Sequence, residues 1–192
     1  MIVSRRRFAK TLLGAAMLAV TGTGKVLAGP EHMVRRPIPS SGELLPVVGL
    51  GTNRYGVGSS PGERAPLRAA LQRFQMLGGT VIDTAPMYRS SESVLGDLIE
   101  DLGIRDDLFI ATKTDRDDGA DATAAQMHES MRRLKTDTID LMQVHNLRGW
   151  KEALPVMREW QQEGRIRYIG ITTSRSRQYE EFERVMRTED LD

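Results

Sequence analysis

Short apolar runs alternate along the chain with longer stretches in which apolar residues recur at helical spacing. The first pattern is typical of buried strands and the second of amphipathic helices. The apolar runs predict five strands, at residues 47–52, 80–82, 108–112, 139–144 and 166–172. A helix is predicted after each strand, at residues 67–77, 92–102, 122–134, 150–162 and 177–186. Five strand–helix units in a row indicate an α/β protein with a parallel sheet.

Such units occur both in open doubly wound sheets and in barrels. The first strand–helix turn reads Gly49-Leu50-Gly51-Thr52-Asn53-Arg54. It lacks the third glycine that a dinucleotide-binding fingerprint of an open sheet has at this offset. The pattern therefore favours a barrel.

The first 28 residues have the three regions of a signal peptide and are not expected to be part of the fold. A basic head at residues 4–10 precedes a mildly apolar stretch at 11–23 and small or apolar residues at 26–28. The head resembles the twin-arginine (Tat) export signal, with Ala9 in place of the usual leucine. We therefore expect the Tat export machinery as a partner and a periplasmic or otherwise exported protein. The alternatives are a basic amphipathic N-terminus and a single membrane anchor. The apolar stretch is too short and too rich in Gly and Thr for the about 20 residues that span a bilayer.

Residues 29–36 are interpreted as a linker, and residues 37–192 as one folded unit. The unit opens with a turn-rich segment, Ser40-Ser41-Gly42-Glu43, between two apolar pairs, which predicts a short hairpin.

Composition and charge narrow the function classes. The 192 residues include no cysteine, which excludes disulfides, thiolate catalysis and thiolate metal sites. The leader holds five of the 27 basic residues and none of the 26 acidic ones, so the remainder has 22 basic residues and a net charge of −4. A mildly acidic chain gives no electrostatic reason to expect a nucleic-acid partner. No pair of histidines has metal-ligand spacing, so no metal is expected.

Three polar residues directly follow three of the predicted strands. Asp83, Lys113 and His145 each stand at a strand's C-terminal end, and Tyr88 lies on the loop after the first of these strands. One such residue alone usually just meets solvent. In a barrel, however, adjacent strand ends converge on one mouth, so we expect these four side chains to lie together.

Together the four groups suit the reduction of a carbonyl. A lysine held charged by a carboxylate lowers the pKa of a nearby phenol by its electric field. A tyrosine so placed exchanges a proton with an oxygen, and a histidine beside it orients a carbonyl by hydrogen bonding. Because no side chain supplies hydride, this chemistry requires a nicotinamide cofactor.

The stretch Asp83-Thr84-Ala85-Pro86-Met87-Tyr88-Arg89-Ser90-Ser91-Glu92 resembles the aldo-keto reductase pattern D-T-A-x-x-Y-G-x-S-E, with Arg89 for Gly as its one departure. Further motifs agree in order: Gly49 to Thr52, Phe109 to Lys113, Ile139 to His145 and Gly164 to Ile171. The resemblance covers about residues 38 to 190.

The resemblance implies a (β/α)8 TIM barrel and reduction of an aldehyde or ketone with NADP(H), NAD(H) being the other candidate. It implies Tyr88 as general acid, Lys113 and Asp83 as its tuning pair, His145 as the group that orients the carbonyl, and the hairpin as the barrel floor. The cofactor-binding residues that it implies are Gly51, Thr52, Asp83, Asn146, Thr172 and Thr173. Thr173 stands where family members usually have an Asn that holds the nicotinamide amide, and Asn146 is the candidate to take over part of that role.

Length is the larger departure. A complete barrel has eight units and about 250 residues. Here five units are recognised in the 164 residues that remain when 28 are removed from 192. We therefore expect a partial barrel, truncated relative to the family, with unpaired strand edges and a tendency to instability or association.

Two alternatives from other classes stay open, and an inactive fragment is a third. A lyase would use Lys113 to form a Schiff base with its substrate. A non-catalytic barrel would bind nucleotide as a sensor or subunit, which Arg89 and Thr173 favour. The carbonyl substrate is not indicated by the sequence.

Overall fold

The computed structural model describes residues 33–192, so the predicted signal peptide and the first part of the linker lie outside the described residues. A two-stranded hairpin, β1 (Arg35–Pro37) and β2 (Leu44–Pro46), comes first. The remaining strands are β3 (Leu50–Gly51), β4 (Val81–Asp83), β5 (Phe109–Thr114), β6 (Ile139–Val144) and β7 (Ile166–Ile171). The helices between and after them are α1 (Pro61–Met76), α2 (Ser91–Leu102), α3 (Ala120–Leu134), α4 (Trp150–Gln162) and α5 (Tyr179–Thr188). The predicted elements are thus present and in the predicted order. The hairpin begins earlier than predicted, because Arg35 and Arg36 of the predicted linker pair with β2.

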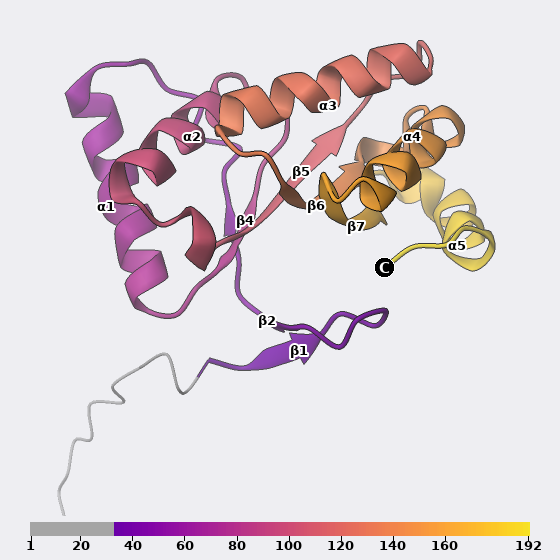
Figure 1. Ribbon diagram of the computed structural model, residues 1–192, viewed down its shortest axis with the longest axis horizontal. Coiled ribbons are helices and arrows are strands. Elements are labelled where there is room, and N and C mark those ends of the chain that lie inside the picture. Colours follow the sequence, from indigo (N-terminus) through magenta and orange to yellow (C-terminus); the bar gives the residue numbers. More distant parts are fainter. Residues whose placement is uncertain (1–32) are drawn as a thin grey trace, which may run out of the picture.

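Strands β3 to β7 form one parallel sheet in the order β3-β4-β5-β6-β7. The order follows the sequence without a reversal, whereas a doubly wound sheet reverses at its switch point. The helices follow one another along the sheet, and the hairpin lies below it (Figure 1). This arrangement confirms the predicted partial barrel of five strand–helix units.

The first strand differs most in length from its prediction. Only Leu50 and Gly51 of residues 47–52 pair with β4, opposite Ile82 and Asp83. A Cβ at Gly49 would lie 3.2 Å from the Val81 carbonyl oxygen, so the glycine lets the two chains approach closely just before pairing begins.

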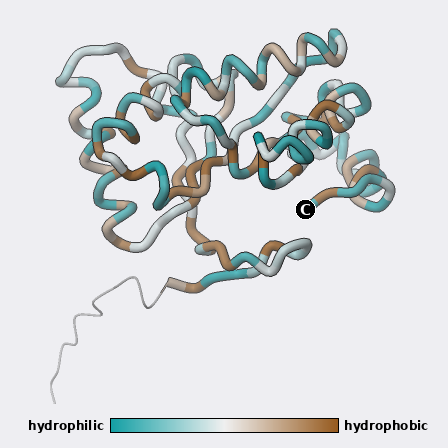
Figure 2. The backbone as a smooth tube through the Cα atoms, viewed as in Figure 1, coloured by the Kyte–Doolittle hydropathy of each residue, from teal (hydrophilic) through white to brown (hydrophobic). Residues whose placement is uncertain are grey.

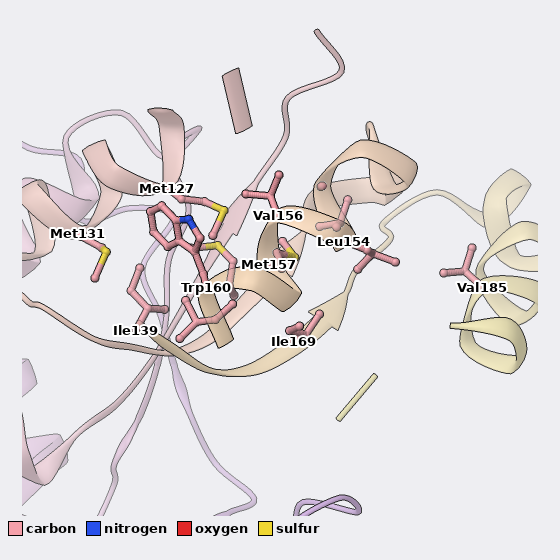
Figure 3. Packing of buried hydrophobic residues seen from close by; sticks show 13 residues of the cluster. Met127, Met131, Ile139, Leu154, Val156, Met157, Trp160, Ile169 and Val185 are labelled. Carbon is pink, nitrogen blue, oxygen red and sulfur yellow. The ribbon is translucent and has the colours of Figure 1, made fainter. Parts of the chain in front are cut away.

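Two apolar clusters hold the helices to the strands. One gathers residues of α1, α2, β4 and β5 around Leu71, Ile82 and Leu95. The other gathers residues of α3, α4, β6 and β7, including Met127, Met157 and Trp160 (Figure 3). Along the backbone, hydrophobic positions on the helices alternate with hydrophilic ones (Figure 2), as expected for helices buried on one side. Among residues 33–192, no helix has the length and apolar character needed to cross a bilayer.

The hairpin is tied to the beginning of β7. The Tyr168 hydroxyl donates to Glu43 Oε2 at 2.6 Å, and Arg167 forms an ion pair with the same carboxylate. The Tyr168 ring also stacks on Phe109 of β5, with 5.8 Å between ring centroids. The hairpin thus contacts the ends of the strands opposite to the predicted mouth, as expected for a barrel floor.

Asp140 of β6 is the buried charge that organises this floor. Its Oδ2 accepts from the Ile110 backbone amide at 2.8 Å and from Arg105 at 3.0 Å, and its Oδ1 accepts from Arg167 at 2.7 Å. Only 4% of Asp140 is exposed. One carboxylate therefore joins β5, β6, β7 and, through Arg167, the hairpin.

Replacing Asp140 by alanine should destabilise the protein by about 3–5 kcal/mol, because it leaves arginine charges and a strand amide without their buried acceptor. Urea unfolding of the full chain measures the change. Asp140→Asn, which keeps an acceptor oxygen, should lose less. The exposed neighbour variant Asp137→Ala should change the free energy of unfolding by no more than about 0.5 kcal/mol. Equal losses at residues 137 and 140 would contradict the role of Asp140.

Candidate active site

The four predicted side chains meet at the carboxyl ends of β4, β5 and β6. Lys113 Nζ lies 2.6 Å from Asp83 Oδ1 and donates to the Thr84 carbonyl oxygen at 2.7 Å. The same ammonium lies 5.2 Å from the centroid of the Tyr88 ring. The Tyr88 and His145 rings stand at right angles, with 6.2 Å between their centroids. The structure thus brings together every residue of the predicted catalytic set.

Strand register explains the meeting of Asp83 and Lys113. Asp83 is opposite Ala111 in the β4–β5 ladder. Because side chains alternate along a strand, Lys113 shares a face with Ala111 and extends beyond the end of β4. His145 follows Val144, the last residue of β6, which is opposite Thr114. Three consecutive parallel strands therefore deliver three polar groups to one edge.

Tyr88 is positioned by its loop. The Tyr88 amide donates to the Ala85 carbonyl at 3.0 Å, and the Ser91 amide donates to the Tyr88 carbonyl at 3.0 Å. A Cβ at Gly56 would lie only 2.7 Å from the Tyr88 carbonyl oxygen, so glycine is required where the β3–α1 loop passes. Arg89 itself has φ 57°, a left-handed conformation that suits glycine better. The loop thus has a left-handed residue, Arg89, at the position where the pattern D-T-A-x-x-Y-G-x-S-E has glycine.

The Ser91 side chain does not cap α2. The helix begins at Ser91 and its cap residue is Ser90, which makes no side-chain capping bond. The Ser91 hydroxyl instead donates to the Thr52 carbonyl at 2.9 Å and lies 3.1 Å from the Thr84 hydroxyl. The Ser91 hydroxyl therefore links the ends of β3 and β4 and is not used to cap the helix.

Two of the predicted cofactor residues, Gly51 and Thr52, differ in exposure: Gly51 faces open space, whereas Thr52 is buried. Thr52 is wholly buried, and its hydroxyl donates to the Asp83 carbonyl at 2.9 Å, so this side chain fixes the end of β3 to the end of β4. Gly51 is exposed, and a Cβ there would meet no atom within 4 Å. Open space therefore reaches the backbone at Gly51, whereas the Thr52 hydroxyl is already engaged inside the protein.

Of the other four, Asp83 pairs with Lys113, while Asn146, Thr172 and Thr173 form a network after β6 and β7. Asn146 has φ 55°, and its Oδ1 accepts from the Ser174 amide at 2.7 Å and from the Ser174 hydroxyl at 2.9 Å. Its own backbone amide donates to the Thr172 hydroxyl at 3.2 Å. Thr173 donates to Gln178 Oε1 at 2.7 Å, and Gln178 in turn donates to the Asn146 carbonyl at 2.8 Å. Within residues 33–192 the side-chain amide nitrogen of Asn146 donates to no partner and so is available to a ligand.

Sequence reasoning missed Ser174 and Gln178 because neither lies at a strand end or in a recognised motif.

Sequence reasoning also left Glu92 without a role. Glu92 is 1% exposed, accepts from the Thr112 hydroxyl at 2.7 Å and lies 3.4 Å from Arg133 Nη1. Burial raises the pKa of the Glu92 carboxyl above its usual value. Its place as the last residue of the recognised pattern was the available signal.

Burial and, after it, the Lys113 ammonium lower the pKa of His145 from its usual value of 6.5, against a smaller opposing effect of Asp115 and Asp83. Both effects favour the neutral imidazole, which can donate one N–H. Lys113 is nearly buried, with 6% of its side chain exposed, while 41% of the Asp83 side chain is exposed.

A pocket of about 420 Å³ opens beside His145 and is lined by Met87, Asp115, Asp117, Asn146, Arg148, Arg175 and other residues of the mouth. A larger hollow of about 650 Å³ lies at the other end of the strands, between the hairpin and Arg105. Its charged side chains include the ion-paired Asp140 and Arg167, so the smaller pocket is the candidate for chemistry. Among the described residues, no group of three potential metal ligands lies together.

The aldo/keto reductase family model matches residues 47–191. The chain belongs to the aldo/keto reductase family. It is 34% identical over 157 residues to the aldo-keto reductase YhdN of Bacillus subtilis, covering 72% of this chain and 46% of that protein. It is 29% identical over 151 residues to L-galactose dehydrogenase of Arabidopsis thaliana, covering 71% and 47%. The chain thus spans about half the length of the curated aldo/keto reductases and related enzymes that it matches.

Solved aldo/keto reductases share the fold. The enzyme of Klebsiella pneumoniae in complex with NADPH is 32% identical, with a TM-score of 0.68 over 82% of this chain and 55% of that chain. An aldo-keto reductase of Bacillus halodurans is 26% identical, with a TM-score of 0.67 over 83% and 56%. Both the predicted family and the partial barrel are confirmed.

The environment of His145 is open to direct measurement. Its NMR titration midpoint should lie below 6.5, because burial and Lys113 both oppose the imidazolium. Lys113→Met removes the cation and should move the midpoint upward. A His145 midpoint that Lys113→Met leaves unchanged would contradict the arrangement.

Proposed function

We propose that the protein reduces an aldehyde or ketone to an alcohol with NADP(H), and that Tyr88, Lys113, Asp83 and His145 carry the reaction. The observation that carries the proposal is the placement of the Lys113 ammonium between the Asp83 carboxylate, at 2.6 Å, and the Tyr88 ring, at 5.2 Å. The edge-on His145 ring completes one cluster around the space where a carbonyl oxygen would sit.

The residues of the mouth fit the nicotinamide end of the cofactor. The unengaged amide nitrogen of Asn146 is a suitable donor to the nicotinamide carboxamide, and the open space at Gly51 lets a flat ring approach the backbone. The Klebsiella pneumoniae relative was crystallised with NADPH, which supports NADP(H) here. When bound, the reduced nicotinamide supplies the hydride that no side chain offers. Thr52, with its hydroxyl engaged elsewhere, contributes only by shaping the end of β3.

Proton supply falls to Tyr88. As the carbonyl carbon receives hydride, negative charge grows on the carbonyl oxygen, and the Tyr88 hydroxyl transfers its proton to that oxygen. The phenolate left behind is stabilised by the Lys113 ammonium and regains a proton from solvent. Asp83 keeps Lys113 charged and in place. The neutral His145 donates its N–H to the carbonyl oxygen, which orients the substrate and stabilises the developing charge.

The Schiff-base alternative fits the geometry poorly. A nucleophilic amine must be neutral, whereas Lys113 Nζ is held by the Asp83 carboxylate and the Thr84 carbonyl. The non-catalytic nucleotide-binding alternative keeps two observations in its favour: Arg89 in a left-handed turn and Thr173 engaged with Gln178.

Tyr88→Phe decides between reductase and sensor. With the phenolic proton gone, kcat for aldehyde reduction should fall by about 10²–10⁴-fold, while the Kd for NADPH stays within about twofold. NADPH consumption and NADPH fluorescence measure the two quantities on the full chain. Tyr179→Phe, an exposed position on α5, is the matched control and should behave as wild type. Unchanged turnover in Tyr88→Phe would refute the role of Tyr88.

We also propose export through the twin-arginine route, supported by the order of basic head, apolar stretch and small residues in the first 28 positions. Replacing Arg5 and Arg6 together by lysine should abolish appearance of the protein in the periplasmic fraction of a Tat-competent bacterium. Arg7→Lys, outside the twin pair, should export normally. Equal export of both variants would rule out this route.

A further inference from the structure

We propose that Arg175 forms an anion subsite at the mouth of the pocket beside His145, which takes a carboxylate of the carbonyl substrate or a phosphate of the dinucleotide. The inference rests on the proposed function, because it names a ligand group for the same site.

Charge pairing within the pocket leaves Arg175 without an acidic partner. Arg148 donates through Nε and Nη2 to both oxygens of Asp117, each at 2.9 Å. Asp115, the other acid of the pocket, accepts at Oδ1 from the neutral Gln126 Nε2 at 2.7 Å and is not bonded to Arg175. Among the described residues, Arg175 forms no ion pair, although its side chain lines the same pocket. An anion in the pocket would therefore meet a cation that the protein has not already neutralised.

The backbone that carries Arg175 is fixed. Its amide donates to the Thr173 hydroxyl at 3.1 Å, and its carbonyl accepts from the Gln178 amide at 2.9 Å. The preceding residue, Ser174, is bonded to Asn146, the neighbour of His145. A ligand would have to order only the side chain and not the loop, which limits the entropic cost of binding.

The charge of Arg175 also reaches the reactive end of the pocket. It is the weakest of the effects on His145, after burial and Lys113, and like them it lowers the pKa of that residue. An anion seated on Arg175 should cancel part of this effect, so anion binding should shift the His145 titration upward. The subsite thus has a readout that does not depend on turnover.

The substrate arm compares 4-oxobutanoate with its methyl ester, which has the same carbonyl without the charge. Arg175→Gln should raise KM for 4-oxobutanoate about tenfold or more, as expected for loss of a charged hydrogen bond, and change KM for the ester by less than twofold. Arg177→Gln, on the same loop and outside the pocket lining, is the matched control and should change neither value.

The cofactor arm measures the Kd for NADPH in the same variants. A tenfold rise in Arg175→Gln, with both aldehydes affected alike, would assign the subsite to a dinucleotide phosphate. No change in either arm, or equal changes in Arg175→Gln and Arg177→Gln, would overturn the proposal.

A binding arm separates this inference from the proposed function. Succinate and inorganic phosphate are titrated into the full chain while the His145 ring is followed by NMR. A shift in the wild type that is lost in Arg175→Gln supports the subsite even if no aldehyde is reduced, in which case only the proposed function fails. Equal responses of the wild type and Arg175→Gln to both anions would overturn the subsite even if reduction is observed.

Discussion

The ion pair between Lys113 and Asp83 is the interaction on which the mouth of this barrel depends. An ammonium with 6% exposure is costly to bury unless it is paired and hydrogen-bonded. Here it is satisfied by Asp83 Oδ1 and by the Thr84 carbonyl, which lie at and just after the end of β4. Any displacement of β4 relative to β5 would leave this charge unpaired. The requirement to pair Lys113 therefore fixes the strand ends, and with them the loop that carries Tyr88.

A second carboxylate holds β5 at the adjacent residue. Glu92 accepts from the Thr112 hydroxyl, while Lys113, whose side chain points to the opposite face of the strand, meets Asp83. Glu92 lies in the first turn of α2, immediately after the loop of Tyr88. The loop that carries Tyr88 is thus joined to β5 on both sides. Before the loop, Asp83 binds Lys113, and after it, Glu92 binds Thr112 on the other face of the sheet. This explains structurally why a buried, protonation-prone carboxyl stands at the end of the recognised pattern.

The spacing of apolar residues and the positions of the strand ends were sufficient to predict most of the fold and the meeting of Asp83, Tyr88, Lys113 and His145 at one edge of the sheet. Apolar runs identify β4 to β7, and the rule that parallel strands share their carboxyl edge predicts that Asp83, Lys113 and His145 lie together. The cofactor residues were harder to predict, because their roles depend on partners distant in the sequence. Nothing local distinguishes Thr52, whose hydroxyl is consumed by Asp83, from a threonine that faces a ligand. Gln178 likewise acquires its role only when the loop after β7 folds back on Asn146.

The two ends of the sheet differ in how far their charged side chains are paired. At the floor, Asp140 is shared by Arg105 and Arg167, and Arg167 continues to Glu43, so the charges there neutralise one another and tie the hairpin to the strands. At the mouth, the pairs of Lys113 with Asp83 and Arg148 with Asp117 leave Asn146 and Arg175 with unused donors. The hollow at the floor is larger than the pocket beside His145, yet Asp140 and Arg167, two of the charged side chains that line it, are paired with each other. Hydrogen-bond donors without a protein partner, rather than volume, therefore identify the end of the barrel that can bind a ligand.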